Sequence, residues 1–450
     1  MDTQAGSGVQ TNGAKGKFRR SQTASEVIER QKKFLFPAVM TYYDTPLPIQ
    51  RGEGHYVWDF DGRKYLDFFG GILTVSVGHC NPTVNAALHK QNDTLQHVST
   101  LYPTAPNVDL AARLAELAPG DLSQTFFTNS GTEADETAVM LARMATGSHE
   151  IIALRHSYSG RSHLNTTMTA HSPYRGLPDM VAGVKHALAP YCYRCPLKLE
   201  PGTCGVACAE DLEELIRTTT TGRPAAFMAE PILGVGGFIV PPKEYFPIVA
   251  DIIHKYEGLL IIDEVQTGWG RTGDKMWGIE HWGVTPDIMT MAKGAANGIP
   301  MGITMSTPEI AKKWRGLTIC TFGGNPVSCE ATMATIDVIE EQNLLHNCSR
   351  LGALLRKRLE GLQEKFKCIG DVRGMGLMQA VELVKDRKTK EPDAETVKKL
   401  FEATRELGML IGKGGLYGNT LRLSPSMTIT EAELNQGADI LEKAFEKVAY

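Results

Sequence analysis

The chain has 450 residues, of which 42% are hydrophobic and 22% are charged, so it is long enough to bury the cores of a large domain and a smaller one. Its formal net charge of −4 gives no reason to expect a nucleic acid or an anionic membrane as a partner. No apolar run approaches the length of a membrane-spanning helix, so we expect a soluble globular protein.

Residues 1–23 are predicted to be a disordered arm. They are polar and rich in glycine, and they lack the apolar core of a secretory signal. Their basic residues would suit a transit peptide, but Asp2 and the absence of an amphipathic pattern argue against one. Nine cysteines, an odd number in a chain without a signal, indicate reduced thiols. We therefore expect a cytoplasmic protein and keep the mitochondrial matrix as the less favoured alternative.

Residues 24–81 are predicted to form the N-terminal part of the smaller domain. Segment 24–36 has the periodicity of a short amphipathic helix, and segment 57–71 is typical of a hairpin that turns at Asp61-Gly62.

From residue 82 to residue 345, helical patterns alternate with short apolar runs, which is typical of a mostly parallel sheet between helices. A helix is expected over 108–120, ended by Gly120. The pattern therefore predicts one large α/β domain. Its expected strands are 124–128, 150–154, 225–230, 259–265, 287–291 and 301–306.

Four cysteines within this domain have the spacing C-x2-C-x8-C-x3-C, and four thiolates could enclose a zinc ion. The two pairs are closer together than in a usual zinc ribbon, so we favour a thiol-rich surface loop without a metal. The metal candidates are Cys192, Cys195, Cys204 and Cys208.

Residues 346–450 change pattern again and are predicted to form the rest of the smaller α+β domain. The expected elements are a helix over 347–366, a strand pair around 376–384, a helix over 394–408 and a strand over 420–425.

An acid and an amine follow two of the expected strands. Asp263 ends the apolar run 259–262, and Lys293 comes directly after 287–292. Because ligands of an open α/β sheet collect outside the carboxyl ends of its strands, both groups can act on one bound molecule. Pyridoxal phosphate (PLP) needs such a pair, a lysine for a Schiff base and an acid for its ring nitrogen. The alternative, an ordinary strand-end acid and a solvated lysine, has equal weight on these two residues alone.

Other motifs favour a phosphate and a planar ring. Ser130 and Glu133 have capping-box spacing, and Gly131 between them lets a ligand approach the N-terminus of the following helix. Tyr158 follows a strand and could stack on a ring. Thr321 precedes a helix that Pro326 would begin, and its hydroxyl could also bind phosphate. Each motif has an ordinary alternative: a capped helix with nothing bound, a packed loop tyrosine and a tight turn.

Two further signals concern other ligands. Arg422 in the last expected strand could bind a substrate carboxylate, or it could lie solvated at the sheet edge. GWGRTG at 268–273 matches the G-x-G-x-x-G pattern of nicotinamide and flavin sites, but no convincing helix follows it and it belongs to a late strand. The dinucleotide interpretation is therefore weak.

Taken together, NSGTEADE, AEPI, IIDEVQTGWGRTG, MAKG and TFGGNP resemble the class III, fold type I, PLP-dependent aminotransferases, in the order and near the spacing of that family. The resemblance runs from about residue 30 to the end. It implies a large domain with a mostly parallel seven-stranded sheet flanked by helices, and a homodimer or dimer of dimers with active sites at the interface.

The same resemblance assigns roles to single residues. It implies that Lys293 forms the Schiff base with PLP and that Asp263 pairs with the ring nitrogen. Thr321 would reach the phosphate of the neighbouring subunit, and Arg422 would bind the substrate. The other cofactor-binding residues that it implies are Gly131 and Thr132 at the phosphate, Tyr158 on the ring, Gln266 at the phenolic oxygen, and Glu230 in AEPI.

The substrate class follows from finer likenesses. Segments 370–378 and 291–302 resemble the alanine–glyoxylate branch of the class, whereas Val235 stands where the ornithine and 4-aminobutyrate branches carry a gating glutamate. We therefore predict a transaminase that moves an amino group from an amino acid such as alanine, or a related amine or β-amino acid, to glyoxylate or pyruvate. The alternatives are a decarboxylase, aminomutase or phospholyase on the same scaffold, an ω-aminotransferase, and a cofactor-free metal-binding or interaction protein.

Overall fold

The computed structural model describes residues 18–448, which divide into two units. The first unit contains the chain up to Arg51 together with Trp58–Arg63, and the second contains Gly52–Val57 and everything from Lys64 on. Of the disordered arm expected over residues 1–23, residues 1–17 lie outside the described part.

The first unit contains α1 (Ala24–Phe34), which confirms the predicted helix in a slightly shorter form. The Thr23 hydroxyl caps it by accepting the N–H of Glu26 at 3.2 Å. The turn predicted at Asp61-Gly62 is also present, because the carboxylate of Asp59 accepts the N–H groups of Asp61 and Arg63 at 3.0 and 2.9 Å. Strands β1 (Ile49–Glu53) and β2 (Tyr56–Asp59) run across the boundary of the two units.

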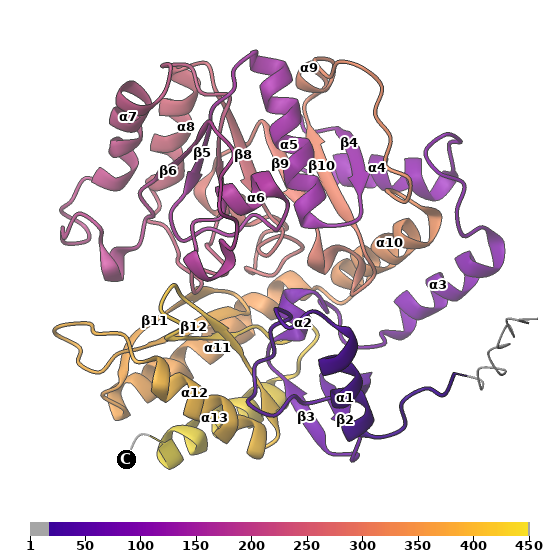
Figure 1. The fold of residues 1–450 in the computed structure, drawn as a ribbon, viewed down its shortest axis with the longest axis vertical. Coiled ribbons are helices and arrows are strands. Elements are labelled where there is room, and N and C mark those ends of the chain that lie inside the picture. The colour runs from indigo at the N-terminus through magenta and orange to yellow at the C-terminus, as the bar shows by residue number, and fades with distance from the viewer. Residues whose placement is uncertain (1–17, 449–450) are drawn as a thin grey trace, which may run out of the picture. The chain divides into compact units, whose positions relative to one another are not determined.

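The second unit is built on a seven-stranded sheet with the order β4-β10-β9-β8-β7-β5-β6 (Figure 1). Strands β5 to β9 run parallel to one another, and β10 is antiparallel to both of its neighbours. The predicted mostly parallel sheet is therefore confirmed. The strands are β4 (Gln124–Thr128), β5 (Ile151–Leu154), β6 (Val184–Ala187), β7 (Ala226–Ala229), β8 (Leu259–Asp263), β9 (Ile288–Met291) and β10 (Gly302–Ser306).

Helices pack along this sheet, and apolar side chains fill the space between the layers. Val139 and Ala142 of one helix pack with Ile151, Ile261 and Ile288 of three strands, and all of these side chains are buried. The helices of this part are α3 (Pro82–Thr94), α4 (Ala105–Leu117), α5 (Gly131–Thr146), α6 (His163–Met168), α7 (Ala207–Thr219), α8 (Tyr245–Lys255), α9 (Pro308–Ala311) and α10 (Pro326–Glu341).

The helix expected over 108–120 differs from the prediction at both ends. It begins at Ala105, because Thr104 has an extended backbone and Pro106 suits the first helical turn. It ends at Leu117, and Gly120 lies beyond it in a turn with a φ of +62°. A proline inside the first turn was the signal for the earlier start.

The C-terminal part carries a second, antiparallel sheet with the order β11-β12-β15-β14, next to three helices (Figure 1). Helices α11 and α12 and strands β11, β12 and β15 match the predicted segments. Strand β14 and the last helix, α13, were not predicted. Strand β13 (Met409–Leu410) pairs in parallel with β3 (Lys64–Asp67), which joins an early segment to this part. The elements are α11 (Leu344–Lys365), β11 (Ile369–Met375), β12 (Met378–Leu383), α12 (Ala394–Glu406), β14 (Gly412–Gly414), β15 (Thr420–Leu423) and α13 (Glu431–Val448).

Within residues 18–448, no helix is both long enough and apolar enough to cross a membrane.

Candidate active site

A cavity of about 180 Å³ opens where β7, β8 and β9 end and where α5 begins. This is the edge of the sheet at which a ligand is expected in an open α/β fold. The cavity brings together every cofactor residue predicted from the sequence except Thr321. It is lined by Ser130, Gly131, Thr132, Asp135, Tyr158, Ser159, Gly160, Glu230, Asp263, Val265, Gln266 and Lys293.

Asp263 and Lys293 reach this cavity from adjacent strands. Asp263 is the last residue of β8, which pairs in parallel with β9, and Lys293 follows the end of β9 by two residues. Lys293 has a φ of +41° and begins a short 3-10 turn, so the chain bends sharply here. The expectation that the acid and the amine share one site is met by this geometry.

Burial shifts the ionisation of both groups toward their neutral forms. It raises the pKa of Asp263 to about 6, although the N–H of Val265 at 2.9 Å and the nearby Lys293 act in the opposite direction. Burial lowers the pKa of Lys293, against the opposing effect of the acids Asp263 and Glu230. A lower pKa makes the neutral amine, which is the nucleophilic form, more accessible near neutral pH.

Two more buried acids lie beside this pair. Burial and the charge of Asp263 raise the pKa of Asp135 well above its usual value, and the Thr290 hydroxyl donates to its carboxylate at 2.7 Å. Burial and Asp263 also raise the pKa of Glu230, to about 8. Asp135 was not predicted from the sequence, although it lies one helical turn after Gly131 and therefore on the same face of α5.

Glu230 shapes the backbone around the cavity. Its carboxylate accepts the N–H of Tyr158 at 3.1 Å and the N–H of Gly234 at 2.8 Å. These bonds connect the end of β7 to the two loops that flank the cavity. Glu230 therefore lines the site and also fixes the position of Tyr158, whose half-buried ring packs edge-on to Tyr174 with centroids 5.2 Å apart.

The N-terminus of α5 forms one wall of the cavity. The Ser130 hydroxyl accepts the N–H of Glu133 at 3.2 Å, and the Glu133 carboxylate accepts the N–H of Asn129 at 2.7 Å, so the predicted cap is confirmed. The N–H groups of Gly131 and Thr132 stand in the first helical turn, where no helical carbonyl precedes them. A Cβ on Gly131 would lie 3.2 Å from a methyl group of Val265, so only glycine leaves the wall as open as it is.

The residues of the cavity fit PLP. Gln266 has a buried side-chain oxygen without a hydrogen-bond partner in the described part of the chain, which marks a group that a bound polar molecule would satisfy. Gly234 leaves room for this side chain, because a Cβ on Gly234 would lie 2.4 Å from the Gln266 amide. PLP needs an amine for its aldehyde, an acid for its ring nitrogen, a helix N-terminus for its phosphate and a polar side chain for its phenolic oxygen. The cavity offers all four groups.

Arg422 lies outside the cavity lining and is buried. Its Nε donates to the carbonyl of Lys413 at 2.9 Å and its Nη1 to the carbonyl of Gly234 at 3.2 Å. The guanidinium lies 4.8 Å from the ring centroid of Phe69 and 5.5 Å from that of Phe238. Because Arg422 is 3% exposed and β15 is an inner strand of its sheet, the alternative of a solvated edge arginine is wrong. Among residues 18–448, no carboxylate lies within ion-pair distance of the guanidinium.

Thr321 is exposed and does not line the cavity of its own chain. Its neighbours Ile319 and Phe322 are also exposed, at 56% and 60%. This placement leaves the predicted role of Thr321 at a neighbouring subunit as a prediction.

The cysteine cluster lines a separate small pocket in the loop that precedes α7. Burial and the neighbouring thiols raise the pKa of Cys192, and they raise that of Cys208 to about 12, so both thiols are protonated in the metal-free protein. Within residues 18–448, no group of three or more His, Cys, Asp or Glu residues is placed to hold a metal ion. The zinc interpretation of Cys192, Cys195, Cys204 and Cys208 stays a prediction, which metal analysis of the protein tests.

The GWGRTG segment serves the fold. A short 3-10 turn (Gly278–Trp282) follows it in place of a helix, so the helix N-terminus that a dinucleotide site needs is lacking. Glu264 organises this turn by accepting the N–H groups of Gly278 and Ile279 at 2.9 and 2.8 Å. The dinucleotide interpretation is therefore wrong.

The fold and the cavity are those of a PLP-dependent transaminase, and comparison with known proteins identifies the family. A family model described as aminotransferase class-III matches residues 39–445, so the chain belongs to the class III aminotransferases. The family that the sequence motifs resemble is thereby confirmed, and so are the fold type and the cofactor.

Similar proteins cover almost the whole chain. A mitochondrial alanine–glyoxylate aminotransferase 2 homolog from Arabidopsis thaliana is 42% identical over 94% of this chain and 87% of its own length. A leucine/methionine racemase from Thermococcus litoralis is 36% identical over 94% and 96%. The PLP-bound crystal structure of an amine transaminase from an uncultivated Pseudomonas species superposes with a TM-score of 0.87, at 33% identity over 92% of this chain and 99% of that one.

Proposed function

We propose that this transaminase takes its amino group from an α-amino acid such as alanine and gives it to a small keto acid such as glyoxylate or pyruvate. The observation that carries the proposal is the buried Arg422 guanidinium, which has no carboxylate partner in the described residues. A buried charge of this kind favours a ligand that brings the opposite charge. A substrate carboxylate is such a ligand, and its bidentate geometry suits the guanidinium.

The residues of the cavity divide the chemistry between them in this proposal. The Lys293 amine would hold the cofactor until the amino donor takes its place, and the freed amine would then accept the proton of the substrate Cα. When bound, PLP supplies the electron sink that lets this carbon lose its proton. Asp263 holds the proton of the ring nitrogen, and Gly131 with Thr132 binds the phosphate through N–H groups. Tyr158 and Gln266 fix the plane of the ring.

Val235 supports the preference for α-amino acids. It is buried in the loop after β7, and its carbonyl accepts the N–H of Gly415 at 2.9 Å next to the Arg422 side chain. A valine cannot neutralise the guanidinium when a substrate enters with its carboxylate at the far end. We therefore expect ornithine and 4-aminobutyrate to react poorly at their ω-amines.

A donor panel tests the proposal. Alanine, β-alanine, 4-aminobutyrate and ornithine are each offered with glyoxylate and with pyruvate, and the keto products and released CO₂ are quantified. The proposal requires alanine to have the largest kcat/KM and the keto product to equal the amount of aminated acceptor. A larger kcat/KM for 4-aminobutyrate contradicts the substrate assignment. Carbon dioxide, or a D-amino acid as the main product, would instead indicate a decarboxylase or a racemase like the one from Thermococcus litoralis.

We also propose that the working unit is a homodimer or a dimer of dimers, in which Thr321 completes the phosphate site of the neighbouring subunit. The support is the exposure of Thr321 together with that of the apolar Leu317, Ile319 and Phe322 around it. Exposed apolar side chains in one segment are typical of a subunit contact.

For the compartment, we propose one in which thiols stay reduced, either the cytosol or the mitochondrial matrix. All nine cysteines are free in the structure, and the Arabidopsis relative is described as mitochondrial. Imaging of the full chain with a fluorescent C-terminal tag decides between the two.

A further inference from the structure

Two arginines of the small sheet bind the same loop. Arg373 on β11 and Arg422 on β15 lie at the same position on either side of Ala380 in β12. Residues directly opposite one another in neighbouring strands point to the same face of a sheet. From this face, Arg373 Nε donates to the carbonyl of Gly237 at 2.8 Å, and Arg422 Nη1 donates to the carbonyl of Gly234 at 3.2 Å.

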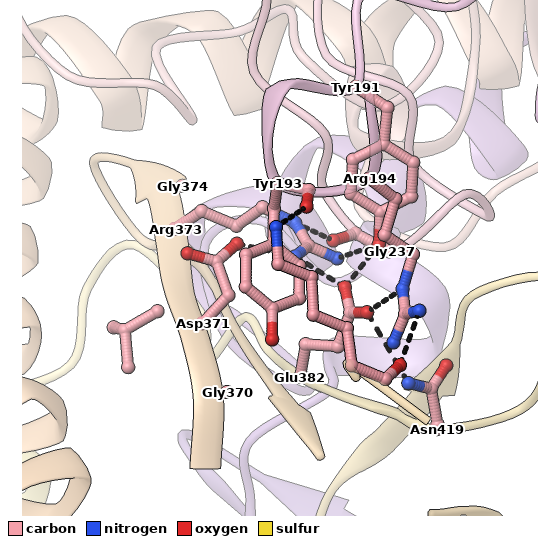
Figure 2. A network of polar contacts seen from close by, with 12 residues as sticks. Tyr191, Tyr193, Arg194, Gly237, Gly370, Asp371, Arg373, Gly374, Glu382 and Asn419 are labelled. Carbon is pink, nitrogen blue, oxygen red and sulfur yellow. Dashed lines mark hydrogen bonds and ion pairs between the residues drawn. The ribbon is translucent and has the colours of Figure 1, made fainter. Parts of the chain in front are cut away.

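The two arginines differ in their charge partners. Arg373 forms ion pairs with Asp371 at 2.7 Å and with Glu382 at 2.6 Å, as Figure 2 shows. Arg422 has no such partner in the described part of the chain. Both side chains are buried. The same face of the sheet therefore carries one guanidinium that is paired with carboxylates and, across Ala380, one that is not.

Glu382 lies where it can reach either arginine. It is fully buried on β12, opposite Asp371 of β11 and opposite Thr420 of β15. Arg373 and Arg422 each lie two residues along from those positions, so both are diagonal neighbours of Glu382 on one face. Diagonal neighbours in a sheet are within reach of long side chains.

A network of donors holds Glu382 on the side of Arg373 (Figure 2). The Tyr191 hydroxyl and Arg194 Nε donate to its two oxygens, and Asn419 donates from 3.4 Å. Arg373 Nη2 also donates to the Tyr191 hydroxyl at 3.2 Å. Although burial raises it, the pKa of Glu382 is held below its usual value by Arg373, Tyr191 and Arg194, so the carboxylate is ionised at neutral pH.

We propose that Arg373 and Arg194 are positioning residues that hold the Glu382 carboxylate away from Arg422, so that Arg422 stays free for the carboxylate of an amino acid. The inference rests on the proposed function, in which Arg422 binds the substrate. A released Glu382 would pair with Arg422 and compete with every substrate that carries a carboxylate. It would do so at the binding step, without touching the cofactor residues.

The test is a cycle of variants of the PLP-loaded enzyme. Arg373→Gln is expected to raise KM for alanine about 10-fold or more and to change kcat by less than about 3-fold, because an internal anion competes with the substrate. Adding Glu382→Gln should return KM to within about 3-fold of the wild-type value. Arg373→Lys keeps the charge and is the matched control, with KM close to wild type. A purely structural role for Arg373 predicts the opposite, a double variant as impaired as the single one.

A carboxylate-free donor separates the two proposals. The KM for 1-phenylethylamine should not rise in Arg373→Gln, because this amine does not need Arg422. A parallel rise for both donors overturns the inference. If the wild-type enzyme fails to convert alanine, the proposed function is wrong. If the wild-type enzyme converts alanine but Arg373→Gln leaves the KM for alanine unchanged, only the inference about Arg373 is wrong.

Arg194→Gln keeps the test decisive if the buried Arg373→Gln variant does not fold. The Arg194 side chain is 17% exposed and supplies one of the donors to Glu382, so its loss disturbs the interior less. It should raise KM for alanine in the same direction by about 3-fold, and Glu382→Gln should reverse the effect. An unchanged KM in a folded Arg194→Gln variant, or a rise that Glu382→Gln does not reverse, contradicts the proposal.

Discussion

Asp263 and Lys293 lie at the carboxyl ends of the neighbouring parallel strands β8 and β9, and both side chains line one cavity. Burial raises the pKa of Asp263 to about 6 and lowers that of Lys293. The acid is therefore prepared to share a proton with a ring nitrogen, and the amine to attack an aldehyde. This relationship is the physical basis for assigning the chemistry to these two residues.

The first prediction concerns the stability of the cofactor-free protein. Since the pKa of Asp263 is raised from 3.8 to about 6 on folding, the folded state binds the proton more tightly than the unfolded state. The ionisation of Asp263 therefore lowers the free energy of unfolding as the pH rises. The loss begins at about pH 4 and reaches its full value of roughly 3 kcal/mol above about pH 6. Asp263→Asn keeps an acceptor for the Val265 N–H and removes the charge.

Asp263→Asn should accordingly raise the Tm of the cofactor-free protein at pH 8 by more than it does at pH 5, while transamination falls by at least about 100-fold. Thermal unfolding at the two pH values, with the exposed Asp274→Asn as control, provides the comparison. An equal Tm change at both pH values would show that Asp263 is not held near its neutral form.

The second prediction concerns substrate binding. Arg422→Ala should lower kcat/KM for alanine about 30-fold or more, because the substrate carboxylate loses its buried partner. Lys413→Ala is the matched control, since this exposed residue lies on the neighbouring strand β14 and contacts Arg422 only through its backbone carbonyl. If Arg422→Ala turns over alanine as fast as Lys413→Ala, the carboxylate is bound elsewhere.

The third prediction concerns the subunit interface. Thr321→Asp should weaken PLP binding at least about 10-fold, because a carboxylate would repel the phosphate of the neighbouring site, whereas Thr321→Ser should bind normally. Subunit exchange between Thr321→Asp and Lys293→Ala should then restore about a quarter of the wild-type sites, since half of the dimers are mixed and each has one complete site. Activity that stays at the level of the separate variants after proven exchange argues against a shared site.

The fourth prediction concerns the cysteines. Metal analysis of protein prepared without metal-affinity steps should find far less than one ion per chain, because the two cysteine pairs are closer together in the sequence than in a usual zinc ribbon. Under denaturing conditions all nine cysteines should react with a thiol reagent. One zinc ion per chain in the wild-type protein, and none in Cys208→Ser, would support the metal interpretation.

Much of the seven-stranded sheet and of the helices along it could be predicted because their signals are local. Strand β8 is a continuous apolar run that ends in an acid, and the N-termini of α5 and α10 carry Ser130 and Asn325 as caps. The edge strand β6 (Val184–Ala187) was missed, because it is short and half-buried and its residues VKHA carry no apolar run. Strand β14 was missed for a similar reason, since GKG has almost no side chains to pack.

The site was predictable where its residues lie at or shortly after the ends of strands. Asp263 ends β8, Lys293 follows β9 by two residues, and the helix cap Ser130 follows β4 by two residues. Asp135 and the network around Glu382 depend on which side chains face each other after folding, and spacing in the sequence does not contain that information. The pairing of Arg373 and Arg422 across Ala380 likewise depends on strand register.

The measurement that tests the central assignment most directly is reductive trapping of the PLP-loaded enzyme. Borohydride should abolish the visible absorbance of the cofactor and fix the pyridoxyl group on one peptide, and mass spectrometry of that peptide should place it on Lys293. Lys275→Ala, which removes an exposed lysine from the loop after β8, should trap normally, and Lys293→Ala should not trap at all. Recovery of the label on another lysine in the wild-type enzyme would contradict the assignment of Lys293 and the account of the site built on it.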